Sequence, residues 1–342
     1  MSPIRRYSRL ARALLSYWRG RIVLDHMPIR MWIEPTNRCN LRCRVCPQST
    51  PRQAASAQGM MDFDLYKKII DEASLYLHDL NLFHTGESLL HRDIFKMIRY
   101  AKQKGLTTRL HTNGALLTTP FSEQIIDSGL DLLSFSFDGY DKETYESMRV
   151  RGNFDKTLGN IRRFLEIKKQ RQSRLPYTIF EVMNIFQGAR NGRAEFEGRF
   201  KGLPLDRFVV KEAHNWAGTY EVGGESGVVK QVFTCCTFPW YALVVFWDGR
   251  VDPCPQDFFG DIFLGDLTKQ TIAEVWNGEP MLRLRRRMVA KNVDGIVPCE
   301  TCDMLERESF LGVPTLNLKT FLKENLLGYR TKGQGDRDKA KG

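Results

Sequence analysis

The chain has 342 residues, of which 42% are hydrophobic and 27% charged. This length suits one large domain with a smaller one, and the composition excludes a disordered chain. No run of about 18 apolar residues occurs, so we expect no transmembrane helix. The net charge of +11 is uneven, because residues 1–30 hold seven arginines and one acid. The remainder is only mildly basic, and we exclude nucleic acid as a partner.

Residues 3–19 are predicted to form a basic amphipathic helix. Leu10 and Leu14 fall on its apolar face at about 100° per residue, and Arg12 on its basic face. The helix either packs its apolar face on the main domain, or lies on an anionic membrane or an acidic partner. The segment lacks the pattern of a secretory signal. We therefore expect a cytoplasmic protein, with contact at the inner face of the membrane as an alternative.

From residue 30 to about 212, strand and helix patterns alternate. Strands are predicted at 31–35, 80–84, 107–114, 131–139, 177–184 and 207–213, and helices at 62–77, 91–104, 120–128 and 154–170. Repeated βα units imply an α/β fold with a parallel sheet, either open or closed into a barrel. In such sheets, ligands bind at the C-terminal ends of the strands.

The pattern changes after a flexible break, "GGESG", at 223–227. Residues 241–254 predict a β-hairpin with a two-residue turn at Asp248 and Gly249. Short helices are expected at 269–277 and 280–291, and another near 317–327. We divide the chain into a helical segment (1–29), a barrel (30–222), a second domain (223–311), and a C-terminal helix with a disordered tail (312–342).

Eight cysteines lie in clusters at positions 39, 43 and 46, 235 and 236, 254, and 299 and 302. In a reducing compartment such clusters indicate metal binding or catalysis rather than disulfides. The first set, "CNLRCRVC", follows the first strand. Three thiolates can hold three irons of a [4Fe–4S] cluster and leave the fourth iron open, which is typical of a catalytic site. We expect the interleaved Arg38, Arg42 and Arg44 to favour thiolates by charge.

The motif "CNLRCRVC" resembles the signature of radical S-adenosylmethionine (SAM) enzymes. The resemblance implies that SAM chelates the open iron and is cleaved by one electron to methionine and a 5′-deoxyadenosyl radical, which abstracts hydrogen from a substrate. After the second strand the family usually carries Gly-Gly-Glu-Pro. Here "HTGES" retains Gly86 and Glu87 but departs at Thr85 and Ser88. Glu87 is then expected to orient the methionine ammonium through charge-assisted hydrogen bonds.

Two later stretches, "HTNG" at 111–114 and "SFSFDG" at 134–139, are also similar to this family. The resemblance places Ser136 and Asp138 near the ribose and carboxylate of SAM. The alternative for the first cysteines is a zinc site shared with the C-terminal "CETC". The two pairs would be about 250 residues apart, far beyond the compact spacing of zinc ribbons.

The second cysteine set resembles the auxiliary-cluster extension of the SPASM and twitch subgroups. Gly249 and Cys254 match its G-x4-C hallmark, and no cysteine follows Cys302. The resemblance therefore implies one auxiliary [4Fe–4S] cluster held by Cys236, Cys254, Cys299 and Cys302. Cys235 is the alternative to Cys236, and zinc the alternative metal. Four thiolates saturate such a cluster, so it should relay electrons or staple the fold.

The roles of His84, of Asp257 and of the basic run at 283–288 each have two interpretations. His84 could transfer protons or simply pack, and Asp257 could act as a base or cap a turn. The run "RLRRRM" at 283–288 is expected to be a solvated helix face or a docking site for an acidic flavodoxin or ferredoxin, the expected electron donors.

The resemblance, covering about residues 30–305, implies a partial (β/α)6 barrel followed by a twitch-like domain. We predict a cytosolic radical SAM oxidoreductase, of dehydrogenase type, acting on a small molecule such as a sugar, aminoglycoside or lipid-pathway compound. The alternative is a maturase of ribosomally made peptides. Only 29 residues precede the barrel, fewer than the ~80 of a leader-binding module. A non-enzymatic iron–sulfur electron carrier is a third hypothesis, which would not need an open iron.

Overall fold

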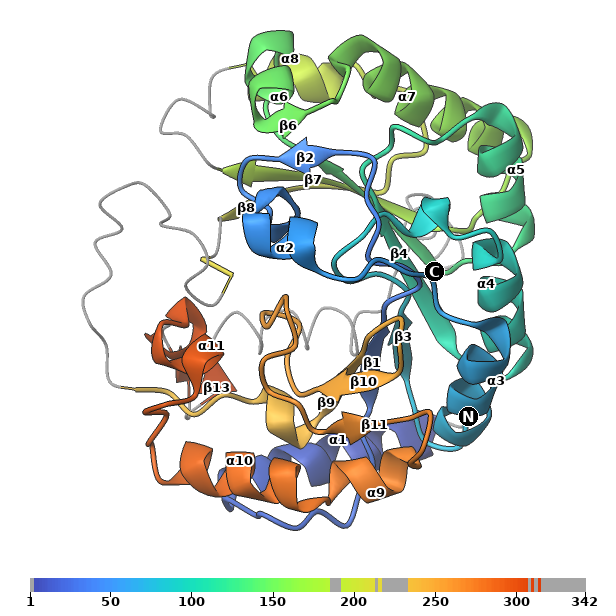
Figure 1. Cartoon of the computed structure of the whole chain (residues 1–342). Coiled ribbons are helices and arrows are strands. Elements are labelled where there is room, and N and C mark those ends of the chain that lie inside the picture. The colour runs from blue at the N-terminus through green and yellow to red at the C-terminus, as the bar shows by residue number, and fades with distance from the viewer. Residues whose placement is uncertain are drawn as a thin grey trace.

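The computed structural model describes residues 3–184, 192–212, 215–216, 233–306, 309–310 and 313–314. Its centre is a nine-stranded sheet in the order β11-β10-β9-β1-β3-β4-β5-β7-β8 (Figure 1). Six parallel strands form the predicted partial barrel: β1 (Arg30–Ile33), β3 (Asp79–Asn81), β4 (Thr107–Thr112), β5 (Leu132–Phe137), β7 (Tyr177–Asn184) and β8 (Arg207–Glu212). The predicted fold class is confirmed.

Helices follow the strands on the outside of this sheet (Figure 1). They are α3 (Phe63–Ala73), α4 (Ile94–Gln103), α5 (Thr119–Asp127), α6 (Lys142–Met148), α7 (Phe154–Gln170) and α8 (Arg193–Gly198). Asp62, where the predicted helix begins, caps α3, since its carboxylate accepts the N–H groups of Asp64 and Leu65. The short helices α2 (Pro51–Ala55) and α6 have too few residues for a periodic signal, and the sequence analysis did not predict them.

The second cysteine region is built on β9 (Ala242–Val245), β10 (Arg250–Asp252) and β11 (Gly265–Asp266). β9 and β10 form the predicted hairpin, but the two-residue turn is wrong in detail. The turn spans Phe246 to Gly249, with the Gly249 N–H donating to the Phe246 carbonyl at 2.9 Å. Gly249 has φ +94°, a left-handed conformation that glycine adopts readily and that lets pairing resume after the turn.

Strand β9 extends the barrel sheet rather than forming a separate one. It runs parallel to β1, with Arg30 opposite Ala242 and Ile33 opposite Val245. β1 therefore has β3 on one edge and β9 on the other. The two cysteine regions share one hydrogen-bonded frame, although the proposed boundary at residue 223 stays a prediction.

The remaining helices lie around the second region, with α11 (Val297–Glu300) to one side of it and the others at its base (Figure 1). They are α1 (Pro3–Trp18), α9 (Ile272–Trp276), α10 (Glu279–Val289) and α11 (Val297–Glu300), and two small strands, β12 (Ser309–Phe310) and β13 (Val313–Pro314), pair near the end of the described chain. Helix α1 buries Leu10, Ala13 and Tyr17, so it packs on the main domain. The helix expected near 317–327 lies outside the described residues. Within the described ranges, no helix combines the length and hydropathy that crossing a bilayer requires.

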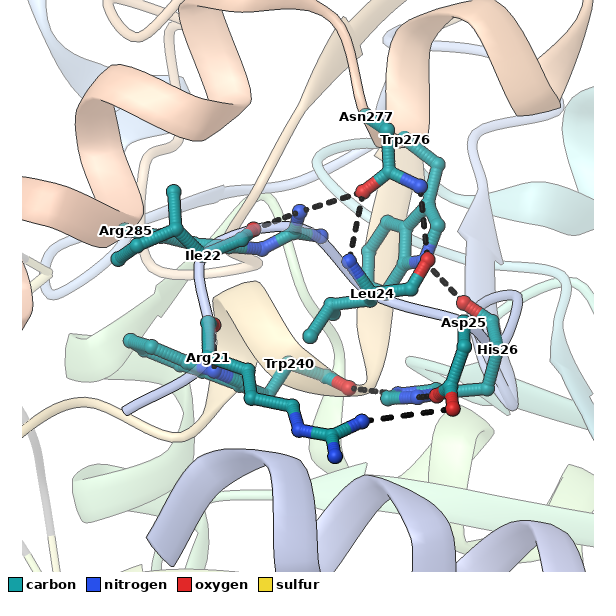
Figure 2. Close-up of polar contacts among 9 residues, drawn as sticks. All are labelled: Arg21, Ile22, Leu24, Asp25, His26, Trp240, Trp276, Asn277 and Arg285. Atoms are coloured by element: carbon teal, nitrogen blue, oxygen red, sulfur yellow. Dashed lines mark hydrogen bonds and ion pairs between the residues drawn. The ribbon is translucent and has the colours of Figure 1, made fainter. Parts of the chain in front are cut away.

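Arg285 fixes the connection between α1 and β1 (Figure 2). It lies within the run predicted to be a solvated helix face, yet it is fully buried. Its guanidinium donates to the carbonyls of Ile22 (3.0 Å) and Pro239 (2.9 Å) and lies over the Trp276 ring, 4.5 Å from its centroid. Burial lowers its pKa to about 9, so it keeps its charge at neutral pH. The solvated-face prediction is thus wrong at this position, because these carbonyls and the ring offer a desolvated cation partners.

Candidate functional site

The first cysteine set lies on the loop after β1, at the C-terminal edge of the barrel sheet. Cys43 belongs to β2 (Arg42–Cys43), which pairs antiparallel with β6 (Arg149–Val150), so that Cys43 is opposite Arg149. Cys46 precedes the short 3-10 helix η1 (Pro47–Ser49). The pairing with β6 fixes the loop after β1 to a segment that follows β5, and β5 is three positions along the sheet from β1.

The Gly-Glu turn after β3 packs directly against the backbone of this loop. The Gln48 side-chain amide donates to the carbonyls of Asn37 (2.8 Å) and Thr85 (2.9 Å), and so bridges the loop and the turn. A Cβ atom at Gly86 would lie under 3.0 Å from the carbonyl oxygens of Thr36 and Arg38, closer than real Cβ contacts. Both opposing atoms belong to the backbone and cannot move aside by a rotamer change. The approach of the turn to the cysteine loop therefore requires glycine.

The Glu87 carboxylate is buried at the ends of β3 and β4. It accepts hydrogen bonds from the Asn113 N–H (2.7 Å), the Thr112 hydroxyl (3.0 Å) and the Leu89 N–H (3.2 Å). Burial raises its pKa and the Asn113 hydrogen bond opposes that rise. The "HTNG" stretch thus holds the glutamate in one orientation, as a residue that positions a cationic ligand group requires.

The positive charge that faces the first thiols comes from Arg149. Burial raises the pKa of Cys39 to about 11 and of Cys46 to about 12, and also raises the pKa of Cys43. The Arg149 charge acts against this rise at all three thiols. We expected the interleaved arginines to do so, but Arg42 donates to backbone carbonyls of its own loop instead. Sequence reasoning missed Arg149, because the two-residue strand that carries it leaves no periodic signal.

Ser136 and Asp138 occupy different environments. Asp138 is buried and accepts a hydrogen bond from the Arg149 Nε atom at 2.9 Å, so it anchors the arginine that faces the thiols. Ser136 is partly exposed and pairs with Glu181 across β5 and β7. The structure therefore places both residues at the C-terminal end of β5 and gives Asp138 an ion-pair partner that the sequence did not indicate.

A second charged group, which the sequence analysis also missed, lies on the strands beside Ser136. The Glu181 carboxylate is 2.7 Å from the Lys211 ammonium and 3.9 Å from the His111 ring nitrogen. Burial would raise the Glu181 pKa, but the charges of His111 and Lys211 outweigh it and the pKa is lowered. Phe83 stacks on His111 with ring centroids 3.9 Å apart. These polar residues interrupt apolar strand patterns in "RLHT", "IFEV" and "VVKE", which is the signal that could have identified them.

The second cysteine set converges on one pocket of about 450 Å³, part of it open to solvent. The cysteines that line it are Cys236, Cys254, Cys299 and Cys302. Cys235 does not line it, and its carbonyl accepts the Tyr17 hydroxyl at 2.7 Å. All eight cysteines are described and none forms a disulfide.

These four thiols fit an iron–sulfur cluster. All four line the same pocket of about 450 Å³, part of which is open to solvent. A four-iron cube is wider than one ion and holds its thiolates further apart than zinc does at about 2.3 Å per bond. Burial raises the Cys299 pKa to about 12, so we expect metal binding to displace protons from these thiols.

Asp257 lines the auxiliary pocket, and His84 immediately precedes the Gly-Glu turn. His84 packs against Phe246 and Phe258, with ring centroids 5.2 and 6.3 Å away, and burial lowers its pKa to about 4. It is therefore neutral at physiological pH. The Asp257 carboxylate accepts the backbone N–H groups of Gly260 (3.0 Å) and Ile262 (2.8 Å). For both residues, these contacts favour the packing and turn-capping interpretations.

Two family models match separate parts of the chain. Residues 33–181 match the Radical SAM superfamily, and residues 235–303 match SPASM, an iron–sulfur cluster-binding domain.

Two curated relatives show the range of the sequence similarity. The tungsten-containing aldehyde ferredoxin oxidoreductase cofactor-modifying protein of Pyrococcus furiosus is 23% identical over 82% of this chain and 89% of that protein. The AdoMet-dependent heme synthase of Methanosarcina barkeri is 33% identical, but over only 41% of this chain and 40% of its own length. Similarity to the heme synthase therefore concerns less than half of either protein.

Solved structures share the fold. Streptococcus suis SuiB bound to precursor peptide SuiA has a TM-score of 0.60 at 13% identity, over 88% of this chain and 75% of that chain. BtrN in complex with AdoMet and 2-DOIA has a TM-score of 0.54 at 18% identity, over 84% of this chain and 98% of that chain.

A three-cysteine loop on a partial barrel, followed by a second cysteine pocket, defines an enzyme with two iron–sulfur clusters. The chain belongs to the radical SAM superfamily, among the members with a SPASM or twitch domain. It binds SAM at a [4Fe–4S] cluster and carries an auxiliary iron–sulfur site.

Substitution of Gly86 by alanine tests the support of the first loop. We expect Gly86→Ala to reduce SAM cleavage about 100-fold, because the added Cβ forces the turn away from the loop and displaces the reacting groups. Gly159→Ala on α7 is the control, since nothing lies within 4 Å of its added Cβ. Release of 5′-deoxyadenosine by reconstituted protein measures both. Wild-type activity in Gly86→Ala would contradict the assignment.

Proposed function

We propose that this radical SAM enzyme is an oxidoreductase that dehydrogenates a small polar molecule. The observation that carries the proposal is the His111, Glu181 and Lys211 group beside Ser136, because it lines the end of the barrel sheet where ligands of parallel sheets bind. An ionised carboxylate and an ammonium suit the hydroxyl and amino groups of a sugar or aminoglycoside.

The first site is assigned residue by residue. Three irons would be held by Cys39, Cys43 and Cys46. Gly86 lets the turn that carries Glu87 lie close to the cysteine loop, and Glu87 would accept hydrogen bonds from the methionine ammonium of SAM. When bound and reduced, this cluster and SAM supply the 5′-deoxyadenosyl radical. Arg149 offsets the negative charge of the thiolates, and Asp138 holds Arg149 in place.

Dehydrogenation removes a hydrogen atom, a proton and an electron from the substrate. The hydrogen atom leaves as part of 5′-deoxyadenosine. Glu181 is kept ionised by His111 and Lys211, and it can accept a hydrogen bond or the proton from a substrate hydroxyl. The electron needs an acceptor, and Cys236, Cys254, Cys299 and Cys302 would hold the auxiliary cluster that would supply one.

Peptide modification is the second candidate. The PqqA peptide cyclase of Bradyrhizobium diazoefficiens is 29% identical over 46% of this chain and 40% of its own length. This relative favours a peptide substrate as the alternative, in which Glu181 and Lys211 would bind a side chain of the peptide. Under either proposal a flavodoxin or ferredoxin would supply the electron for SAM cleavage, and the exposed Arg283 and Arg286 on α10 suit an acidic carrier.

Peripheral contact with an anionic membrane is proposed for α1. Besides the face that it buries, the helix exposes Tyr7, Leu15 and Trp18 by 44–48%. Arg12 and Arg19 are also exposed. Aromatic and apolar side chains flanked by arginines are typical of interfacial helices, where the rings enter the headgroup layer and the cations pair with anionic lipids.

The auxiliary ligands are tested by a pair of neighbouring substitutions. We expect Cys236→Ser to lower the iron and sulfide content by about one cluster, since a cube needs four thiolates. Cys235→Ser should keep the wild-type content, because Cys235 does not line the pocket. Equal loss in both variants, or loss only in Cys235→Ser, would reverse the assignment.

The substrate class is tested with deuterated cell extract, separated into a low-mass fraction and a peptide fraction. We expect the low-mass fraction to transfer deuterium into 5′-deoxyadenosine, and Glu181→Gln to reduce that transfer at least ~10-fold while SAM cleavage without substrate persists. Arg162→Gln, on the exposed face of α7, is the control. Transfer from the peptide fraction alone would favour the maturase, and no 5′-deoxyadenosine from either would exclude the enzyme.

The membrane proposal predicts flotation with vesicles that contain phosphatidylglycerol but not with pure phosphatidylcholine. Leu15→Glu with Trp18→Glu should abolish flotation, because both substitutions place acids on the exposed face. Val297→Glu, on α11, is the control, as Val297 is 66% exposed outside this helix. Flotation that is the same in every variant would contradict a role for α1.

A further inference from the structure

Two consecutive residues, Asn215 and Trp216, reach both cysteine loops. The Trp216 indole N–H donates to the carbonyl of Val45, inside the first loop, at 3.2 Å. The Asn215 side-chain amide donates to the carbonyl of Thr301, inside the C-terminal "CETC", at 2.7 Å. Both acceptors are backbone atoms flanked by proposed metal ligands. The pair therefore joins segments that are separated by more than half of the chain.

Aromatic rings continue this connection toward the second cysteine set. The Trp216 ring meets Phe258 edge to face at 90°, with centroids 5.7 Å apart. Phe258 lies four residues after Cys254, and the centroid of its ring is 6.3 Å from that of the His84 ring. A bulky indole thus stands between the first loop and the neighbourhood of the auxiliary pocket. Edge-to-face contacts between aromatic rings are favourable beyond the area that they bury, so this contact helps to hold the indole in place.

The backbone of Trp216 has an unusual conformation. Its φ is +48°, in the left-handed region that a bulky side chain rarely adopts. Such a conformation persists where the surrounding contacts determine it, and it is frequent at ligand sites. Here it directs the indole to Val45 while the preceding side chain reaches Thr301. Ordinary surface packing of a tryptophan would not require this conformation.

We infer that Asn215 and Trp216 form a brace that fixes the separation of the two cysteine loops and walls the space in which the substrate is held. The inference rests on the proposed function, in which one substrate meets the SAM site and then the auxiliary site. Hydrogen abstraction requires the reacting atoms to be about 3–3.5 Å apart, so a small displacement of either loop is costly. Both residues are positioning residues, because they act through the loops.

Trp216→Phe keeps an aromatic ring but removes the indole N–H, and Asn215→Ala removes the second contact. We expect the double variant to retain wild-type iron content and SAM cleavage without substrate. The fraction of 5′-deoxyadenosine that carries substrate deuterium should fall about 10-fold. The magnetic coupling between the two reduced clusters should also change in the electron paramagnetic resonance spectrum. That spectrum depends on cluster separation, so general destabilisation would not produce the same result.

Leu75→Ala is the control, at an apolar residue that is 72% exposed and to which no role is assigned. It should leave the deuterium fraction and the spectrum unchanged. If the double variant loses iron, Trp216→Phe alone, which keeps the ring contact with Phe258, decides by the same two readouts. Wild-type coupling and deuterium transfer in the variants would overturn the brace. Absence of 5′-deoxyadenosine from the wild-type protein would instead overturn the proposed function.

Discussion

Both iron–sulfur sites depend on the pairing of β1 along its two edges. β3, which leads to the Gly-Glu turn, lies on one edge, and β9, which leads to the auxiliary region, lies on the other. Glu34 extends the connection past the end of the strand. Its N–H donates to the Val245 carbonyl (2.9 Å), and its buried carboxylate accepts hydrogen bonds from Thr85 and the Trp247 N–H. Burial raises the Glu34 pKa to about 7, although these hydrogen bonds oppose the rise.

The two cysteine sets solve different problems with the same side chain. The first is an open loop whose shape depends on two other segments: the turn at Gly86, which packs against its backbone, and β6, which pairs with β2. Its three thiols leave a coordination position for a ligand. The second is a pocket lined by four thiols, Cys299 from α11 and the others from the segments before β9, after β10 and after α11, and these could give a cluster a complete set of ligands. Under the proposed function, a group that exchanges its ligand and a group that passes electrons are thereby kept apart.

Much of this architecture follows from local sequence signals. α7 and β7 were predicted with their observed bounds, because their periodic patterns are long and uninterrupted. The first cysteine loop and Glu87 were found through motifs of fixed spacing. What the sequence did not indicate depends on partners far along the chain. Arg149 is defined by its pairing with Cys43, and Arg285 by the carbonyls that surround it. A periodic pattern carries no information about such partners, so a buried arginine resembles a solvated one.

The β1–β9 pairing also orders events during synthesis. β1 and its cysteine loop leave the ribosome some two hundred residues before Ala242, the first residue of β9, which completes the sheet. Until then the unpaired edge of β1 is a template on which two nascent chains can join. Iron delivered at that stage would meet a cysteine loop whose preceding strand, β1, is paired with β3 but not yet with β9. We therefore expect cluster assembly to follow completion of the sheet, and a polypeptide truncated before β9 to accumulate as aggregates rather than as a barrel with one cluster.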